Sequence, residues 1–199
     1  MRQQYELVIL VALLSLLQAQ FLRAAAEQDF EFDGKKNKDG KAEGEGTAKY
    51  KNGEKFTGNF INGLRDGKGT YYYKNGDRYE GEWRKGVKEG KGVYYWKDGD
   101  KFEGYFENGQ KGEYGKYTYK NGEKYEGQLK NGKREGKGVY YWADGDRYEG
   151  DFKNDKREGQ GVYYWKDGDR SMGDYVNDKE VGLHVRVDKA GHVIEKLYE

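Results

Sequence analysis

Residues Lys133–Phe152 read KREGKGVYYWADGDRYEGDF, and most of this pattern returns at Lys156–Arg170 as KREGQGVYYWKDGDR. The stretch places glycine, charged residues and large aromatic side chains in a fixed register. The leading aromatic residue recurs at a constant interval of 23 residues, at Tyr79, Phe102, Tyr125 and Tyr148. A repeat of this length predicts an array of small structural units, in which each unit is stabilised by stacking on its neighbours.

Within one unit, aromatic residues and glycines occupy every second position. In the unit Tyr79–Lys101, with Tyr79 as position 1, positions 1, 3 and 5 hold Tyr, Gly and Trp, and positions 12, 14, 16 and 18 hold Gly, Gly, Tyr and Trp. A period of two is typical of a β-strand that turns alternate side chains to one face. We therefore predict an all-β fold: an elongated single-layer antiparallel meander of 23-residue β-hairpin repeats, preceded by an N-terminal apolar signal helix.

Two kinds of connection join the predicted strands. The dipeptide Asn75-Gly76 and its Asn-Gly or Asp-Gly counterparts in the other units predict tight hairpins. Such turns need a positive φ at both central residues, which Asn, Asp and Gly tolerate. The second connection, near Asn62-Gly63 or Asn131-Gly132, is predicted to be longer and charged.

A single-layer sheet has no second layer to supply a hydrophobic core. Large rings must therefore cover the backbone of neighbouring strands, and a ring can lie flat only where the neighbour lacks a side chain. The glycines at positions 3, 12 and 14 are predicted to provide that space, so that glycine–aromatic packing replaces an aliphatic core. One unit alone is too small to be stable.

The N-terminal segment, residues 1–26, differs in composition from the repeats. Leu7–Leu22 carries no charge, follows Arg2 and precedes small residues that end at Ala26. A basic start, a short apolar run and small residues are typical of a secretory signal peptide, and the run is shorter than the roughly 20 apolar residues of a transmembrane helix. We predict a signal peptide over residues 1–26 and a location in the secretory pathway, secreted or luminal. The alternative is an uncleaved signal anchor that tethers the protein to a membrane.

Two stretches carry the repeat pattern almost in full: YEGEWRKGVKEGKG at Tyr79–Gly92 and YEGQLKNGKREGKG at Tyr125–Gly138. This pattern, followed by aromatic residues and Asp-Gly or Asn-Gly, resembles the MORN repeat. The resemblance assigns residues 27–182 to a MORN-repeat array of about six units, with a degenerate unit near Asp33 and a divergent one at Ser171. It implies an elongated β-meander with a groove lined by Tyr and Trp. It also implies a role as a scaffold or interaction module. Some members of the family are linked to membranes, and several dimerise.

The tail over residues 183–199 matches no repeat. Its segments LHVRV and HVIEKLY predict a final hairpin around Asp188–Gly191. We expect this hairpin to cap the open end of the sheet, or to pair two chains edge to edge as a homodimer.

Composition argues against several functional classes. The 37 basic and 36 acidic residues give a net charge of +1, without the one-signed field of a nucleic-acid-binding protein. The absence of Cys excludes disulfides, thiol catalysis and Cys-ligated zinc. His184 and His192 lie in the divergent tail, away from any Ser/His/Asp constellation. We expect no enzymatic activity, no cofactor and no metal site, and we assign the Asp-Gly-Asp tripeptides to turns rather than to calcium binding.

Charged residues recur in columns as regularly as the rings. The glutamates at position 2 are predicted on a solvated face beside basic residues two positions earlier: Glu80, Glu103, Glu126 and Glu149 beside Arg78, Lys101, Lys124 and Arg147. A second, basic column occupies position 10, at Arg65, Lys88, Lys111, Arg134 and Arg157. An acidic residue follows four of these five, so we expect the stripe to be locally neutralised.

The aromatic column is the candidate binding site, formed by Trp83, Tyr94, Trp96, Tyr140, Trp142, Tyr163 and Trp165. One sheet cannot bury both of its faces, so part of these rings is expected to remain exposed, and apolar strips of this kind commonly mark partner sites. Tyr and Trp bring a large contact area at a low rotamer cost. We predict a non-catalytic scaffold that binds a helix or strand of a partner protein through an aromatic groove. The alternatives are a secreted carbohydrate- or cell-surface-binding repeat protein and a phospholipid-binding module.

Overall fold

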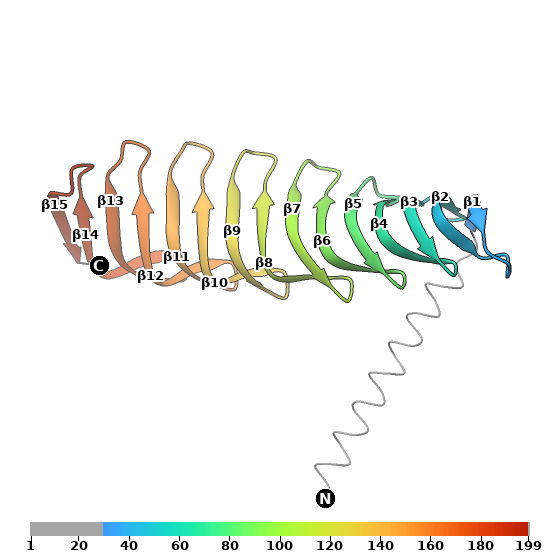
Figure 1. Cartoon of the computed structure of the whole chain (residues 1–199). Coiled ribbons are helices and arrows are strands. Elements are labelled where there is room, and N and C mark those ends of the chain that lie inside the picture. The colour runs from blue at the N-terminus through green and yellow to red at the C-terminus, as the bar shows by residue number, and fades with distance from the viewer. Residues whose placement is uncertain (1–29, 199) are drawn as a thin grey trace, which may run out of the picture. The chain divides into compact units, whose positions relative to one another are not determined.

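The computed structural model describes residues 30–198, which form fifteen β-strands and contain no helix. The strands are β1 (Phe30–Lys36), β2 (Ala42–Tyr50), β3 (Lys55–Ile61), β4 (Leu64–Tyr72), β5 (Arg78–Arg84), β6 (Val87–Tyr95), β7 (Lys101–Glu107), β8 (Gln110–Thr118), β9 (Lys124–Lys130), β10 (Lys133–Tyr141), β11 (Arg147–Lys153), β12 (Lys156–Tyr164), β13 (Arg170–Val176), β14 (Lys179–Val187) and β15 (Val193–Tyr198). They follow one another in chain order in an open antiparallel sheet (Figure 1). The predicted all-β meander is confirmed.

The chain divides into two compact units, Met1–Gly92 and Val93–Glu199. The described part of the first unit holds β1 to β5 and most of β6, and the second unit holds β7 to β15. Each unit has its own set of buried rings.

The predictions for the N-terminus concern residues 1–26, which lie outside the described residues. Between residues 30 and 198 the chain forms no apolar helix of membrane-spanning length. The signal peptide, its alternative as a membrane anchor and the secretory location therefore stay predictions.

The core of each unit is built from the leading aromatic residues of the repeats. Five of them are 0% exposed: Phe56, Tyr79, Phe102, Tyr125 and Tyr148. The ring of Tyr148 lies over Gly150 and Gly161, where an added Cβ would come within 3.0 Å of the ring. The other four rings cover the equivalent glycine pairs at positions 3 and 14 in the same way. The predicted glycine–aromatic packing is confirmed at these two positions.

The glycine at position 12 has a different role from the predicted one. Its nearest side chain is not a ring but the residue at position 4, as for Gly136 and Gln128. The φ angle of Gly136 is +68°, a left-handed conformation that glycine adopts without steric cost. Gly136 lies where the pairing of β9 with β10 shifts register, between Arg134 and Gly138. In this repeat the glycine at position 12 therefore serves a β-bulge and not ring packing.

The two kinds of hairpin connection are the reverse of the prediction. The Asn62-Gly63 and Asn131-Gly132 connections are the tight turns, with two residues between the strands and φ values of 52° and 84°, and of 52° and 77°. The Asn75-Gly76 loop is longer, and there only Gly76 has a positive φ. The Asn75 side chain instead accepts a hydrogen bond from the Asp77 N–H at 3.0 Å. This Asx turn is a second use of the Asn-Gly dipeptide, and the local sequence does not separate the two uses.

Lys85 starts a two-residue turn at a position where the other such turns have Asn, and its φ is 48°. A left-handed backbone costs an ordinary residue about 1–2 kcal/mol, and Asn tolerates it better. We expect Lys85→Asn to raise the free energy of unfolding by roughly 0.5–1 kcal/mol, measured by urea denaturation. The reverse change Asn131→Lys, at the same place in another unit, should lower it by a similar amount. Unchanged urea midpoints for both variants would contradict this account.

The first and last repeats depart from the common pattern. In the first, Phe32 rather than Asp33 supplies the leading ring, which lies over Gly34 and Gly46. The tail hairpin is formed by β14 and β15, which pair from Leu183 to Val187. Since β14 begins at Lys179, the predicted boundary after residue 182 falls inside this strand.

The last repeat moves its core ring from one strand to the next. Ser171 stands at position 1, where the other units have an aromatic ring, and His184 stands at position 14, where they have glycine. The His184 imidazole is 1% exposed and lies over Gly173. Its Nε2 donates to the Asp174 carbonyl oxygen at 2.8 Å. In the preceding unit the Tyr148 hydroxyl donates to the equivalent carbonyl, and His184 therefore replaces both the ring and its hydrogen bond.

Candidate functional site

Eight rings of the second unit form a continuous row. Each ring at position 16 contacts the ring at position 18 of its own repeat. The ring at position 18 then contacts the ring at position 16 of the next repeat, and all these ring centroids lie 4.9 to 6.3 Å apart. We call these side chains the aromatic row: Tyr94, Trp96, Tyr117, Tyr119, Tyr140, Trp142, Tyr163 and Trp165. All eight are half-buried, so each ring is packed on one side and open to solvent on another.

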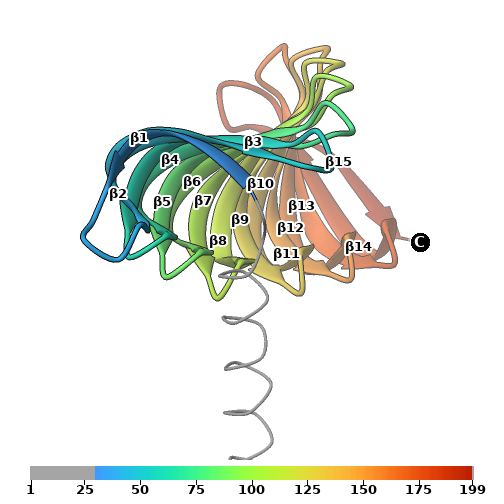
Figure 2. The same cartoon turned by 90° about the vertical axis from the view of Figure 1, so that its right-hand side faces the viewer.

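The longer loops position the rings at position 18. The backbone N–H of Trp142 donates to the Asp146 carbonyl at 2.9 Å, and the backbone N–H of Gly145 donates to the Trp142 carbonyl at 3.2 Å. The backbone of Trp142 thus closes its own loop. In Figure 1 the loops of this kind in the second unit project from the upper edge of the strands, and the two-residue turns lie at the lower edge. The turned view of Figure 2 shows the same separation, so the row follows one edge of the strands.

An acidic residue at position 22 ties each loop to the following repeat. The Tyr140 hydroxyl donates to Glu123 at 2.7 Å, and the Tyr163 hydroxyl donates to Asp146 at 2.6 Å. Asp146 also accepts the backbone N–H of Lys166 at 2.9 Å. Burial, and then the hydrogen bond to a carboxylate, raise the pKa of Tyr140 and Tyr163 above its usual value. These hydroxyls are therefore occupied within the chain, and the rings are held in place by them.

The basic column at position 10 lies on the same face as the rings. The Arg157 guanidinium is 4.8 Å from the centroid of the Tyr175 ring, a cation–π distance. It also donates to the Asp178 carbonyl at 2.6 Å and lies 3.5 Å from the Asp178 carboxylate. The neighbouring acid Glu158 instead accepts the backbone N–H of Asn177 at 3.0 Å. In this repeat the positive charge of Arg157 is balanced by Asp178 of the next turn. The sequence had suggested that the adjacent acid, Glu158, would balance it.

Six of the seven predicted binding residues belong to the aromatic row, and Trp83 does not. Trp83 stands at position 5 in the first unit, is 5% exposed and donates its indole N–H to the Gly69 carbonyl at 3.2 Å. The row also includes Tyr117 and Tyr119, which the sequence analysis missed. Both hold positions 16 and 18 of the repeat that begins at Phe102, so a strict count of positions would have found them.

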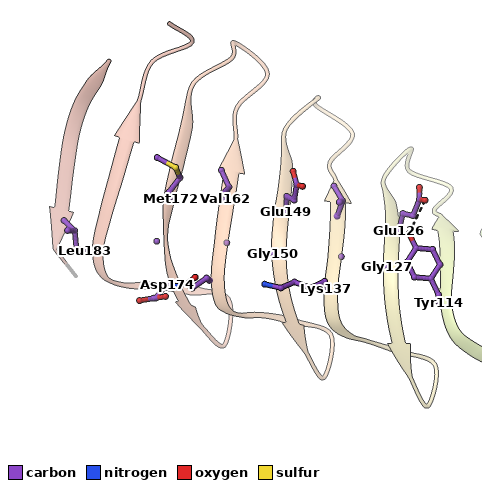
Figure 3. Close-up of a pocket in the computed structure, with 15 residues that line it drawn as sticks. Tyr114, Glu126, Gly127, Lys137, Glu149, Gly150, Val162, Met172, Asp174 and Leu183 are labelled. Carbon is purple, nitrogen blue, oxygen red and sulfur yellow. Dashed lines mark hydrogen bonds between the residues drawn. The ribbon is translucent and has the colours of Figure 1, made fainter. Parts of the chain in front are cut away.

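The opposite face of the sheet carries ion pairs. Arg78 and Glu80 approach to 3.1 Å, and Lys101 and Glu103 to 2.7 Å, as expected for the solvated face. In the second unit this face also has a shallow hollow of about 780 Å³, whose lining includes the paired glycines Gly127 with Gly138 and Gly150 with Gly161. Figure 3 shows charged side chains around it together with the more apolar Tyr114, Val162, Met172 and Leu183.

A Ser–His–Glu cluster forms in the last repeat, whereas the position of His184 in the divergent tail had predicted that it lies apart from such a constellation. Strand pairing places Nδ1 of His184 3.4 Å from the Ser171 hydroxyl and 3.5 Å from the Glu180 carboxylate. Both groups face the same ring nitrogen, while the other nitrogen donates to the Asp174 carbonyl. Ser171 is 2% exposed. This is the arrangement of a packed core, since a nucleophile needs an open hydroxyl and a base that the acid orients from its other nitrogen.

The repeat is matched by a known family model. The model described as "MORN repeat" matches six consecutive segments, residues 38–55, 56–78, 79–101, 102–124, 125–147 and 148–170. A comparison with curated proteins found no match.

Solved structures add a likeness in fold. The TCP domain of SAS-4 (dCPAP) from Drosophila melanogaster, in complex with a proline-rich motif of Ana2 (dSTIL), aligns with a TM-score of 0.54 at 14% identity. The alignment covers 84% of this chain and 90% of that chain. The CPAP G-box domain aligns at 12% identity over 86% of this chain and 99% of that chain, with a TM-score of 0.44. The TCP10 domain of Danio rerio CPAP with a STIL peptide aligns at 15% identity over 85% and 100%, with a TM-score of 0.21.

Proposed function

Because the chain belongs to the MORN-repeat family, we propose that it is a non-catalytic scaffold that binds a segment of a partner protein along the aromatic row. The observation that carries this proposal is the row itself: eight half-buried rings in unbroken contact, with part of each ring open to solvent. Rings of this kind dominate the energetics of interfaces because they bring a large area with few rotatable bonds.

The chemistry around the row also favours a protein segment. Arg157 is paired with Asp178 and Arg186 with Asp169, so the end of the row near these residues offers little net charge to an anionic polymer or a lipid headgroup. The SAS-4 TCP domain, which shares the fold, is bound to a short motif of another protein. If residues 1–26 act as the predicted signal peptide, the partner is a secreted, luminal or membrane-bound protein.

The test uses ligands selected on the full chain from a random peptide display library. We expect Trp96→Ala with Trp142→Ala to weaken the selected peptides by at least thirtyfold, since one truncated hot-spot residue costs about 2 kcal/mol. Circular dichroism confirms that the variant is folded. The matched control is Tyr114→Ala with Leu183→Ala, which removes exposed side chains from the opposite face and should leave affinity unchanged.

The alternatives are tested with the same proteins. A carbohydrate-binding protein would be retained on a glycan array, and a phospholipid-binding module would float with anionic liposomes in a salt-dependent manner. Selected peptides that bind the folded row variant as tightly as the parent chain would rule out the row as the binding site.

A further inference from the structure

The spacing of the aromatic row favours one conformation of a bound segment, an inference that rests on the proposed function. Each repeat contributes two strands, and neighbouring strands lie about 4.8 Å apart, so equivalent rings of successive repeats are about 9.6 Å apart across the strands. Position 18 supplies one such ring in four consecutive repeats, at Trp96, Tyr119, Trp142 and Trp165.

A polyproline II helix matches this spacing. It has three residues per turn with a rise of about 3.1 Å per residue, so one of its faces repeats about every 9.3 Å. An α-helix returns to the same face after seven residues, about 10.5 Å, and a β-strand after two residues, about 6.7 Å. Over the three steps from Trp96 to Trp165 the mismatch grows to about 1 Å for polyproline II and about 3 Å for an α-helix. The repeat distance of a β-strand does not match the ring spacing even at the first step.

The hydrogen-bonding groups of the row complement the same conformation. A polyproline II segment has no internal hydrogen bonds, and its carbonyl groups need outside donors. The hydroxyls of Tyr140 and Tyr163 are occupied by carboxylates of the chain. In contrast, the indole N–H groups of Trp96, Trp142 and Trp165 have no acceptor among residues 93–198 and are not buried, so they can donate to a ligand.

The charge and shape of the row fit a neutral segment. Arg186 lies 4.2 Å from the centroid of the Trp165 ring and is paired with Asp169 at 3.1 Å, so the end of the row carries a compensated charge. Between two successive repeats there is a hollow, lined by Asp100, Tyr119, Lys120, Asn121, Glu123 and Tyr140. This hollow lies between two ring-bearing repeats and can receive one compact side chain of the ligand.

We propose that the aromatic row binds a neutral, proline-rich segment in the polyproline II conformation, lying across the strands with a proline at every third residue. Each proline ring packs between the rings of consecutive repeats, and carbonyl groups of the segment accept the indole N–H groups. Proline suits this role because it holds the conformation before binding and so lowers the entropy cost.

The first experiment titrates the full chain with blocked peptides and follows tryptophan fluorescence, since three of the four tryptophans are in the row. The probes are (Pro-Gln-Gln)₄, which repeats proline every third residue, (Pro-Gln)₆, which has more prolines at the wrong period, and oligoprolines of six, nine and twelve residues. We expect (Pro-Gln-Gln)₄ to bind at least tenfold more tightly than (Pro-Gln)₆. We also expect the oligoprolines to bind more tightly with each added turn.

The second experiment separates ring packing from hydrogen bonding. Trp142→Phe keeps a ring but removes the N–H, and should weaken dodecaproline severalfold, whereas Trp142→Ala should weaken it at least tenfold. Tyr114→Ala with Leu183→Ala, on the opposite face, should leave its affinity unchanged.

The outcomes distinguish this inference from the proposed function. If library-selected peptides need the row but no period-three peptide binds, the polyproline inference is wrong and the scaffold proposal stands. An equal affinity of both Pro-Gln peptides overturns the inference in the same way. If neither selected nor proline-rich peptides depend on Trp96 and Trp142, both proposals fail.

Discussion

Gly161→His is expected to destabilise the chain severely, and the second change Tyr148→Ser is expected to restore much of the loss. Any side chain at Gly161 collides with the buried Tyr148 ring, because even a Cβ would come within 3.0 Å of it. Overpacking costs about 1–3 kcal/mol and more for a whole ring, so we expect the single variant to lose at least about 3 kcal/mol.

The rescue is suggested by the last repeat, which already has this pair of residues. Ser171 and His184 occupy the positions of Tyr148 and Gly161 one repeat later, and the imidazole lies over Gly173. The acceptor is also in place, because the Asp151 carbonyl that now accepts the Tyr148 hydroxyl would accept Nε2 of the new histidine.

Urea denaturation of the parent, both single variants and the double variant forms a double-mutant cycle. We expect a favourable coupling of at least about 2 kcal/mol between the two changes. A double variant less stable than Gly161→His alone would show that the ring cannot be supplied from the neighbouring strand.

The stability contributed by the buried tyrosines is expected to be fully present up to about pH 10 and to fall steeply between pH 10 and pH 12. Burial raises the pKa of Tyr73, Tyr117 and Tyr148 to about 12 each. Tyrosines of the unfolded chain lose their protons near pH 10. Between these values the folded state binds more protons than the unfolded state, so the free energy of unfolding decreases as the pH rises. Below pH 10 both states are protonated and the full contribution is present.

The measurement is the urea midpoint at pH 8, 10, 11 and 12, together with tyrosinate absorbance at each pH. Tyr148→Phe removes one of the titrating groups and should make the decline shallower, although its stability at pH 8 also reflects the lost hydrogen bond to Asp151. Full tyrosine ionisation at pH 10 in a chain that is still folded would contradict the account.

The strands and the ring–glycine pairs could be predicted from sequence because both follow from a period of two nested inside the longer period of the repeat. The turns could not, because the backbone conformation of Asn-Gly depends on which flanking residues pair. Asn62 adopts a left-handed φ, while Asn75 accepts a hydrogen bond in a longer loop. The role of His184 was also hidden, since its partner Ser171 becomes a neighbour only through the pairing of β13 with β14.

The residues of the aromatic row could be predicted only in part, for a similar reason. Positions 5 and 18 both carry rings on the same face, and alternation along a strand does not separate them. Trp83 lies within β5 and is covered by its neighbours, whereas Trp96 and Trp142 lie at the base of a loop, where the sheet ends and solvent begins. Whether a ring is core or surface was thus decided by its distance from the strand end.

The hydrogen bonds that fix each loop join it to the following repeat, as from the Tyr163 hydroxyl to Asp146. They use a tyrosine at position 16 and an acidic residue at position 22, as Tyr140 and Glu123 also do. Duplication of one whole repeat would therefore reproduce its own attachments on both sides. A gene of this design can gain or lose whole copies, and the length of the ring-bearing sheet then follows the number of copies.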